Sequence, residues 1–374
     1  MKKFLSLALV IVMVFALAAC GGPAKPVTTA APTDAGAATP LNVSVFFYDY
    51  SDTYIGYVRA DLEGLLKDNA VTYTFYDGAS DQAKQFTQVE TALTQGSNLL
   101  VVNIVTTGSD EAAQNIVDAA KEKDVPIIFF NREVSDEVIN GYEKCCFVGT
   151  DADEAGYMQG EMIANFLQAD DNMTKYDLNA DGQISYIMFR GELGNAEAFG
   201  RTLYSVTKAN ELLGKTVLVP SAANQNDSTQ PADGISPFYL YGNWSASTAK
   251  NLMDTALTTY TLDSGDIEMI IANNDDQALG AIESMNEKGY NTGDAAAPYI
   301  PVFGVDATPV AQDAIANAKM TGSIMQDHMG MAKGIYFFIT NVGAGETLFS
   351  GTEGFNVDEG VSKVRIPYAI YTGK

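Results

Sequence analysis

The sequence predicts an α/β protein with two doubly wound parallel-sheet domains, and three observations carry that prediction. From Leu41 onward, short apolar runs alternate with longer stretches of helical periodicity, the pattern of a parallel sheet covered by helices. The alternating scheme then repeats in the second half of the chain. Roughly 330 residues follow Pro40, too many for one hydrophobic core and about right for two.

The first half supplies one sheet. Its amphipathic stretches place apolar residues on one helical face, as Ile55, Val58 and Leu62 do. The expected helices are Tyr54–Lys67, Asp81–Gln95 and Asp110–Lys123. The expected strands are 41–47 (LNVSVFF), 71–76 (VTYTFY), 98–105 (NLLVVNIV), 125–130 (VPIIFF) and 144–150 (KCCFVGT).

The second half repeats the scheme. Its expected helices are Glu197–Leu213, Ser245–Tyr260, Asp276–Lys288 and Pro309–Asn317. The expected strands are 184–189 (ISYIMF), 216–220 (TVLVP), 267–273 (IEMIIAN), 300–305 (IPVFGV), 321–326 (TGSIMQ) and 363–370 (KVRIPYAI). Residues 221–238 are polar and rich in Asn, Ser and Pro, which predicts a surface insertion.

The N-terminus indicates export. Lys2 and Lys3 precede an apolar run that ends in Leu-Ala-Ala-Cys, the pattern of a secretory signal peptide over residues 1–19. Those four residues also resemble a bacterial lipobox, so we expect Cys20 to be lipidated and to anchor the chain to the outer face of the cell membrane or in the periplasm. Residues 20–40 are small residues and Pro without an apolar period, which predicts a flexible tether.

The amino-acid composition excludes several classes of binding partner. The formal charge of −25 argues against binding nucleic acid or anionic lipid head groups and fits an exported protein with a neutral ligand. Apart from Cys20 the chain has only Cys145 and Cys146, adjacent on an expected strand. Neighbouring cysteines pair with each other only under strain, so we expect two buried small apolar residues and no disulfide framework.

Polar side chains follow the carboxyl ends of the expected strands, where open α/β sheets bind ligands. Carboxylates, amides and guanidinium groups there match vicinal hydroxyls, because a sugar hydroxyl can donate to a carboxylate and accept from an amide or Arg. Helix N-capping would explain any single one of them, but explains the whole set poorly. The set comprises Asp49, Asp52, Asn131, Arg132, Asn195, Glu197, Arg201, Asn274, Asp275, Asp306, Gln326 and Asp327.

Catalytic signatures are missing from the sequence. The single His, His328, has no Ser or Cys motif beside it, and no glycine-rich phosphate loop occurs, so we interpret His328 as structural. The only Trp, Trp244, precedes an expected helix. It is either a packing residue or, as the polar set favours, an aromatic face for a pyranose ring.

The stretch 177–185 (DLNADGQIS) has the oxygen spacing of a calcium loop. Asp177, Asn179 and Asp181 occupy positions 1, 3 and 5, Gln183 offers a carbonyl and Ser185 stands at position 9. Position 12 is Met188, which cannot bind a hard cation. Either the loop is a polar turn, or a carboxylate reaches it from a distant segment.

These features together resemble the periplasmic galactose/glucose-binding protein family, the solute receptors of methyl-galactoside ABC importers. The resemblance runs from about Leu41 to Tyr368 and is densest in the segments VPIIFFNRE, FVGTDADEAGYMQGEMIA, YDLNADGQISYIMFRGE, IEMIIANNDDQALGAIE and PVFGVDATP. It implies a type I periplasmic binding protein fold with a three-segment hinge near 149–151, 326–327 and 365–367. The implied domains are 41–149 plus 327–364 and 150–326 plus 365–374.

The resemblance also assigns site residues. A remote Glu closes the calcium loop in this family, and the matching residue is Glu268, so Ca²⁺ is expected on Asp177, Asn179, Asp181, Gln183, Ser185 and Glu268. The family has Gln where Ser185 stands, which could weaken the site or bring in a water. The matching sugar ligands are Asp52, Asn131, Arg201, Asn274 and Asp306, with Trp244 stacking on one ring face and Tyr54 replacing an opposing Phe.

Three sugar positions depart from the family. Its His falls on Asn195, its Asp on Glu197 and its Asn on Gln326, and the last two lengthen an arm by one methylene. The resemblance therefore implies the class of site more firmly than the sugar. The expected function is a monomeric, lipid-anchored, non-enzymatic receptor that delivers D-galactose or D-glucose to an ABC permease.

Other functions remain open. A chemoreceptor could be a second partner, and a secreted carbohydrate-active enzyme with Glu197 and Asp306 as an acid/base pair is the alternative from another class. A sugar-responsive repressor would need a helix-turn-helix where the signal peptide stands.

Overall fold

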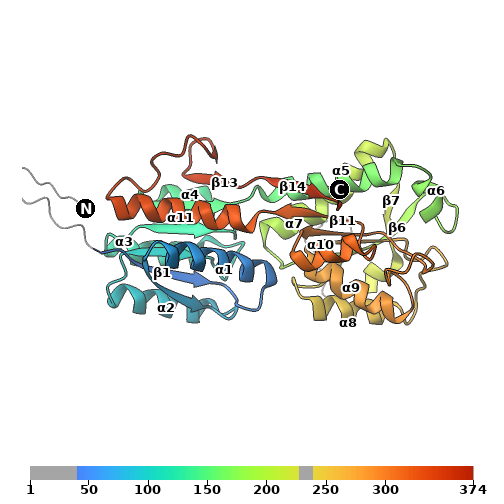
Figure 1. Ribbon diagram of the computed structural model, residues 1–374, viewed down its shortest axis with the longest axis horizontal. Coiled ribbons are helices and arrows are strands. Elements are labelled where there is room, and N and C mark those ends of the chain that lie inside the picture. The colour runs from blue at the N-terminus through green and yellow to red at the C-terminus, as the bar shows by residue number, and fades with distance from the viewer. Residues whose placement is uncertain (1–39, 227–238, 374) are drawn as a thin grey trace, which may run out of the picture. The chain divides into compact units, whose positions relative to one another are not determined.

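The structure is a computed structural model that describes residues 40–226 and 239–373 (Figure 1). Within these residues it contains two seven-stranded sheets, as the sequence predicts. The predicted signal peptide and all of the tether except Pro40 lie outside the described residues. No helix in the described part of the chain is both long and apolar enough to cross a membrane.

The first sheet has the order β12-β13-β5-β4-β3-β1-β2 and is parallel except for the edge pair β12–β13. Its strands are β1 (Asn42–Phe47), β2 (Thr72–Asp77), β3 (Leu99–Val102), β4 (Ile127–Phe130), β5 (Cys145–Gly149), β12 (Asn356–Val357) and β13 (Lys363–Arg365). The helices against it are α1 (Thr53–Asp68), α2 (Gln82–Thr94), α3 (Asp110–Glu122), α4 (Asp136–Asn140) and α11 (His328–Ala344).

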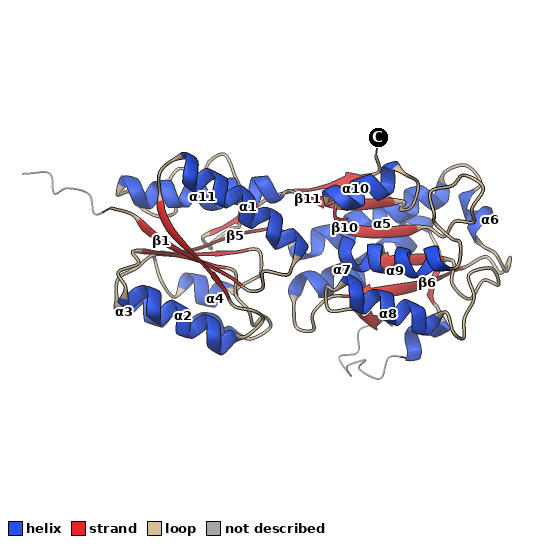
Figure 2. Cartoon of the chain, turned by 60° about the horizontal axis from the view of Figure 1, so that its bottom comes forward, coloured by secondary structure: helices blue, strands red, loops and turns tan. Residues whose placement is uncertain are grey.

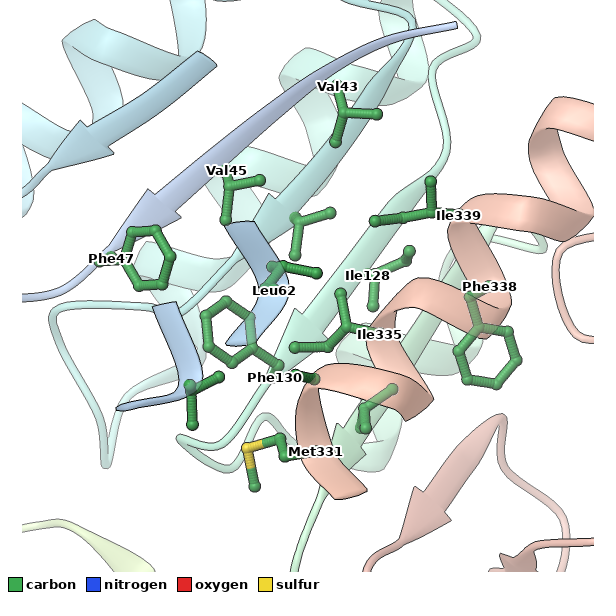
Figure 3. Packing of buried hydrophobic residues seen from close by; sticks show 14 of the residues in the cluster. Val43, Val45, Phe47, Leu62, Ile128, Phe130, Met331, Ile335, Phe338 and Ile339 are labelled. Carbon is green, nitrogen blue, oxygen red and sulfur yellow. The ribbon is translucent and has the colours of Figure 1, made fainter. Parts of the chain in front are cut away.

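Helices cover both faces of the first sheet, with α1 and α11 on one side of β1 and α2, α3 and α4 on the other (Figure 2). Alternate residues of β1 supply the two cores. Val43, Val45 and Phe47 pack with Leu62 of α1 and with Ile335 of α11 (Figure 3). Phe46, between them, belongs to the core under α2 and α3.

The second sheet has the order β14-β11-β10-β9-β6-β7, with β8 also paired to β6, and only β14 is antiparallel to its neighbour. Its strands are β6 (Ile184–Arg190), β7 (Leu218–Pro220), β8 (Leu240–Tyr241), β9 (Met269–Ala272), β10 (Val302–Asp306), β11 (Gly322–Gln326) and β14 (Tyr368–Tyr371). The helices are α5 (Ala152–Gln168), α6 (Asn172–Tyr176), α7 (Ala196–Leu213), α8 (Ala246–Ala256), α9 (Asp275–Glu287) and α10 (Pro309–Ala316), with a short 3-10 helix at Ala222–Asn226.

The chain crosses between the sheets three times, after β5, after β11 and after β13. The crossings lie next to one another. The Ile366 amide donates to the Gly149 carbonyl at 2.7 Å, and Arg365 Nη1 donates to the Thr150 carbonyl at 2.7 Å. Gln326 and Tyr368 are partners in the β11–β14 pair. This is the predicted three-segment hinge.

Three expectations need correction. The stretch 363–370 is two strands in different sheets, because Ile366 and Pro367 carry the third crossing between β13 and β14. The segment 328–344 forms α11, a helix for which no element was predicted; it is so rich in apolar residues that it shows no clear polar face. Ser221 and Asn224 begin the predicted surface insertion but are buried; the rest of that insertion, 227–238, lies outside the described residues.

The prediction of two buried, unpaired cysteines is confirmed. Cys145 and Cys146 are unpaired and buried, and burial raises the pKa of Cys145 to about 12. His328 begins α11, with Nδ1 2.5 Å from Asp61 Oδ2 and its ring stacked on Tyr57.

Candidate functional site

One pocket collects all ten residues that the sequence assigned to ligand binding. Tyr48, Ile55 and Arg132 complete its lining. Its volume is about 40 Å³, and it adjoins a second pocket of about 720 Å³ that shares Tyr48, Asp52 and Trp244. The inner pocket alone has room for a few water molecules. The ten residues are Asp52, Tyr54, Asn131, Asn195, Glu197, Arg201, Trp244, Asn274, Asp306 and Gln326.

Strand ends bring these side chains together, as expected for the carboxyl edges of parallel sheets. Asn131 follows β4, while Asp306 and Gln326 end β10 and β11. Residues of both sheets contribute, because Asp52 and Asn131 belong to loops of the first sheet and the others named here to the second.

Three pocket residues are also helix N-caps, so the capping alternative holds for each of them. Asp52, Asn195 and Asn274 accept from the amides of Ile55, Ala198 and Gln277 at 2.8–3.0 Å. One oxygen serves the cap in each case and leaves the rest of the group for other partners. Asp52 Oδ2 accepts from the Tyr48 hydroxyl at 2.6 Å, and Asn274 Nδ2 donates to the Trp244 carbonyl at 3.1 Å. Capping therefore fixes these side chains in the pocket wall.

Three pocket residues have a strained backbone. Asn131, Trp244 and Asp306 have φ angles of 62°, 63° and 114°, in the region that non-glycine residues rarely adopt, although positive φ also occurs at residues outside the pocket. Conformations of this kind cost about 1–3 kcal/mol each and persist where the surrounding structure enforces them.

Arg201 is the buried cation of the site, with 4 % of its side chain exposed. Its Nη1 donates to the Asn273 carbonyl at 2.9 Å, and its Nη2 donates to Gln326 Oε1 at 3.1 Å and to the Tyr368 hydroxyl at 2.9 Å. Burial alone would lower the pKa of the guanidinium, but Tyr368, Asp306 and Glu197 together raise it. Arg201 thus stays charged at the centre of the site.

Two buried carboxyls face this cation. Burial raises the pKa of Asp306 well above its usual range, against the lowering effect of Arg201, whose Nη1 lies 3.9 Å from Asp306 Oδ1. Burial also raises the pKa of Glu197, and Arg201 again opposes the rise. Neither oxygen of Glu197 has a hydrogen-bond partner within the described residues.

The indole of Trp244 is half-buried and lines both pockets. Its centre lies 5.7 Å from the guanidinium carbon of Arg201. The ring therefore closes one side of the space into which Arg201 and the carboxyls point, the arrangement that stacking on a sugar face requires.

Tyr48, Ile55 and Arg132 were missing from the predicted site. The Arg132 guanidinium lies 4.2 Å from the centre of the Tyr48 ring, and Arg132 is paired with Glu192 of the β6–α7 loop. Their positions in the sequence could have predicted this, because Arg132 directly follows Asn131 at the same strand end and Tyr48 directly follows β1.

Two polar contacts join the two sides of the pocket. Arg132, after β4, pairs with Glu192, after β6. The Thr53 hydroxyl of α1 donates to Asp276 Oδ2 of α9 at 2.7 Å. Both contacts connect a loop or helix of the first sheet to one of the second.

The predicted calcium loop turns tightly around its own carboxylates. Asp177 accepts from the amides of Asp181 and Gly182 at 3.0 and 2.8 Å. Glu268, distant in sequence, lies against this loop: its two oxygens accept from the amides of Leu178 and Ser185 at 2.6 and 2.7 Å.

The donor set of this loop is made of hard oxygens, which suits Ca²⁺. The carboxylates of Asp177, Asp181 and Glu268 are joined by the side-chain oxygens of Asn179 and Ser185 and by the carbonyl of Gln183. No group of three or more His, Cys, Asp or Glu side chains is already gathered around a metal position in the described part of the chain.

Comparisons with known proteins agree with one another. Residues 43–347 match the model of the periplasmic binding protein domain family. The D-galactose/methyl-galactoside binding periplasmic protein of Haemophilus influenzae is 31 % identical over 87 % of this chain and 88 % of its own. An ABC transporter solute binding protein of Bacillus halodurans with bound myo-inositol aligns with a TM-score of 0.67 at 21 % identity, over 90 % of this chain and 96 % of its own. One of Clostridium phytofermentans with bound β-D-glucose gives 0.65 at 19 % identity, over 89 % and 94 %.

Proposed function

This chain belongs to the periplasmic binding protein family, and we propose that it captures D-galactose or D-glucose and delivers it to an ABC transporter. One observation carries the proposal. A single pocket gathers the ten predicted side chains, most of them planar polar groups and one of them the only Trp of the chain.

The chemistry of that pocket matches a sugar. Each hydroxyl of a sugar can donate one hydrogen bond and accept others, so it is best held between a carboxylate and an N–H donor. Asp52, Glu197 and Asp306 supply carboxylates, and Asn131, Asn274 and Arg201 supply donors. The indole of Trp244 offers the apolar surface on which the C–H face of a pyranose ring stacks.

The choice of galactose or glucose is supported by the relative from Haemophilus influenzae, whose printed name gives D-galactose and methyl-galactoside. The ligands of the structural neighbours range from myo-inositol to β-D-glucose, and the likeness to those neighbours concerns the fold. The pocket thus supports a sugar as the class of ligand, and the relative supports the choice of the particular sugar.

The fold supplies a mechanism for capture. Three adjacent crossings make a hinge about which the two sheets, each with its helices, can close on a ligand. Closure removes water from the polar groups and so strengthens their hydrogen bonds to the sugar. The Arg132–Glu192 and Thr53–Asp276 contacts join the two sides, and closure would bring the two sides into one surface for a permease to recognise.

Location and assembly complete the proposal. The chain would act outside the cytoplasm as a monomer, held at the membrane by lipidated Cys20 with residues 20–40 as a tether. The site would act in binding alone, without turnover of the sugar.

A calcium ion is proposed for the loop 177–185. Asp177, Asn179, Asp181, Gln183 and Ser185 would hold it together with Glu268, which already touches both ends of the loop. The ion would offset the repulsion between three carboxylates and tie the loop to the segment before β9.

Calorimetry tests the proposed function. The protein from Ala38 onward is titrated with D-galactose, D-glucose, D-ribose and myo-inositol. We expect D-galactose or D-glucose to bind at micromolar concentration or below, with no change in the sugar afterwards. Binding of neither hexose, or release of product from a hexoside, would contradict the proposal.

A further inference from the structure

A larger outer pocket adjoins the inner pocket that holds the predicted sugar ligands. It measures about 720 Å³, against about 40 Å³ for the inner pocket, and the two share Tyr48, Asp52 and Trp244. Pockets that hold small ligands commonly measure about 300–1,000 Å³. Apart from Asp52 and Trp244, no residue of the outer wall is among those that the sequence assigned to ligand binding.

The outer pocket lies on the side away from the hinge. Ser80 follows β2, the edge strand of the first sheet, and Ser245 follows β8, which pairs with β6. The strands at the chain crossings, β5 and β13 in one sheet and β11 and β14 in the other, lie toward the opposite ends of the two strand orders. The outer pocket therefore extends from the inner one toward the side on which a hinged cleft opens.

The outer pocket persists while the two sides are in contact. Two residues of its wall make the contacts between the sides: Glu192 pairs with Arg132, and Asp276 Oδ2 accepts from the Thr53 hydroxyl at 2.7 Å. A space that existed only because the two sides stand apart would not be bridged by its own wall. A ligand group could therefore stay in this pocket after the sides have met.

The wall carries groups that form hydrogen bonds with hydroxyls. The hydroxyls of Ser51 and Ser80 donate to Asp49 at 2.7 and 2.6 Å, so their oxygen lone pairs remain as acceptors. On the other side the Tyr241 hydroxyl donates to Asn243 Oδ1 at 3.0 Å. Groups that both donate and accept, as sugar hydroxyls do, match this wall.

The charge of the wall excludes an anionic occupant. Asp49, Glu192 and Asp276 line the outer pocket, and no Lys or Arg among the described residues does. Each of these carboxylates already has a donor, so none of them requires a cation from the ligand. An apolar group would leave the hydroxyls and carboxylates that it covers without water or another partner. A neutral polar group fits best.

We propose that the outer pocket receives a second sugar ring, joined to the one held in the inner pocket, so that the protein binds disaccharides as well as single hexoses. Asp52 and Trp244 line both pockets and mark where the linkage between the two rings would pass. This inference rests on the proposed sugar-binding function and adds to it a larger class of substrate.

Calorimetry compares D-galactose and D-glucose with four neutral disaccharides that are first freed of monosaccharide. Lactose and melibiose contain a galactose ring, cellobiose and maltose contain only glucose, and the four differ in linkage. We expect at least one of them to bind no more than about tenfold more weakly than the tighter hexose. Hydrogen bonds from the outer wall should offset the cost of ordering the second ring.

Two variants fill the outer pocket from opposite walls, so the test survives if one of them fails to fold. Ser51→Tyr adds a ring from the loop after β1, and Ser247→Tyr adds one from α8. Neither position lines the inner pocket, so each variant should weaken disaccharide binding at least about tenfold more than hexose binding. Thr87→Tyr, at an exposed position of α2 that lines neither pocket, should keep the wild-type ratio of the two affinities.

The outcomes separate the two ideas. If every disaccharide binds more than about tenfold more weakly than the hexose, or if both filling variants keep the wild-type ratio, the outer pocket holds no second sugar while the hexose receptor stands. Tighter binding of phenyl β-D-galactoside than of every disaccharide would assign the outer pocket to an aromatic group and overturn the proposal. If neither a hexose nor a disaccharide binds, the proposed function itself fails and the inference fails with it.

Discussion

The indole of Trp244 occupies the space that a side chain at Gly191 would need. A Cβ built on Gly191 would lie 2.3 Å from Cη2 of the indole, far closer than two carbon atoms approach. Gly191 directly follows β6, and Trp244 stands in the turn before α8. The aromatic wall of the pocket therefore depends on the absence of a side chain at the neighbouring strand end.

Gly191→Ala should weaken hexose binding about tenfold or more, because the added methyl pushes Trp244 out of the pocket wall. Calorimetry with D-galactose and D-glucose measures the loss, and the Trp emission of the free protein should change as well. Gly64→Ala is the matched control, since Gly64 lies exposed on α1 with no atom within 4 Å of a built Cβ. Equal affinities for Gly191→Ala and Gly64→Ala would contradict this role of Gly191.

Arg201→Ala should cost more affinity than Tyr54→Phe. Removing Arg201 deletes a charged donor, takes away the cation beside Asp306 and leaves Glu197 only the weaker influence of Arg132, which should cost about 2 kcal/mol or more. The Tyr54 hydroxyl lies 3.8 Å from the sulfur of Met331, a weak contact, so its loss should cost under about 1 kcal/mol. Hexose titrations of both variants give the ranking, and the reverse order would show that Arg201 does not face the sugar.

Much of the pocket could be predicted because it follows from topology. Parallel strands end at one edge of a sheet, so Asp306 and Gln326 had to lie near one another once the strands were recognised, and Asn131 had to lie at the corresponding edge of the first sheet. Tyr48 and Arg132 also stand at the carboxyl ends of strands. Arg132 stands at a strand end in the sequence, but the family resemblance does not assign its position to the sugar, so the predicted site omits it.

Other features could not be read from local patterns. Residues 328–344 are so apolar that they lack the polar stripe by which an amphipathic helix is recognised, yet they form α11. The division of 363–370 between two sheets depends on tertiary pairing. Glu268 could be assigned to the calcium loop only through the family resemblance, because no spacing rule joins it to a loop more than eighty residues away. Which atoms of Glu197 and Gln326 are left free depends on geometry alone.

Chelation should lower the melting temperature of the protein by several degrees. A ligand bound only by the folded state stabilises it by mass action, about 2.7 kcal/mol at a hundred times its Kd. Glu268→Gln should respond less to chelator than wild type, because one carboxylate of the proposed calcium site is gone. The measurement is thermal unfolding with calcium and with excess chelator.

Glu211→Gln serves as the control, since it removes an exposed carboxylate of α7 that is not among the proposed calcium ligands. It should keep the full wild-type response. Superimposable wild-type melting curves with and without calcium would rule the site out.

Stability should fall with rising pH because of Asp275. Burial raises the pKa of this carboxyl to about 7, although Ser323 and Thr308 donate to it. The pKa of Asp275 is therefore higher in the folded protein than in the unfolded chain. Its contribution to the free energy of unfolding is fully present below pH 3.8 and is lost as the pH rises through about 7. The negative charge of nearby Asp276 adds to the rise.

The test compares denaturant unfolding of wild type and Asp275→Asn between pH 4 and pH 8. The variant does not titrate at this position, so the wild-type free energy of unfolding should drop relative to the variant by more than about 1 kcal/mol over this range. A difference that stays constant with pH would show that Asp275 is ionised throughout.

Because the chain crosses between the sheets three times, the first sheet is completed only late in synthesis. Strands β1 to β5 emerge early, but α11 and β13, which cover and extend their sheet, come only after β6 to β11. Until then the apolar face formed by Val43, Val45 and Ile128 has no α11 against it. A chain truncated after Gln326 would lack α11 and β13, so part of its first sheet would stay uncovered and open to aggregation.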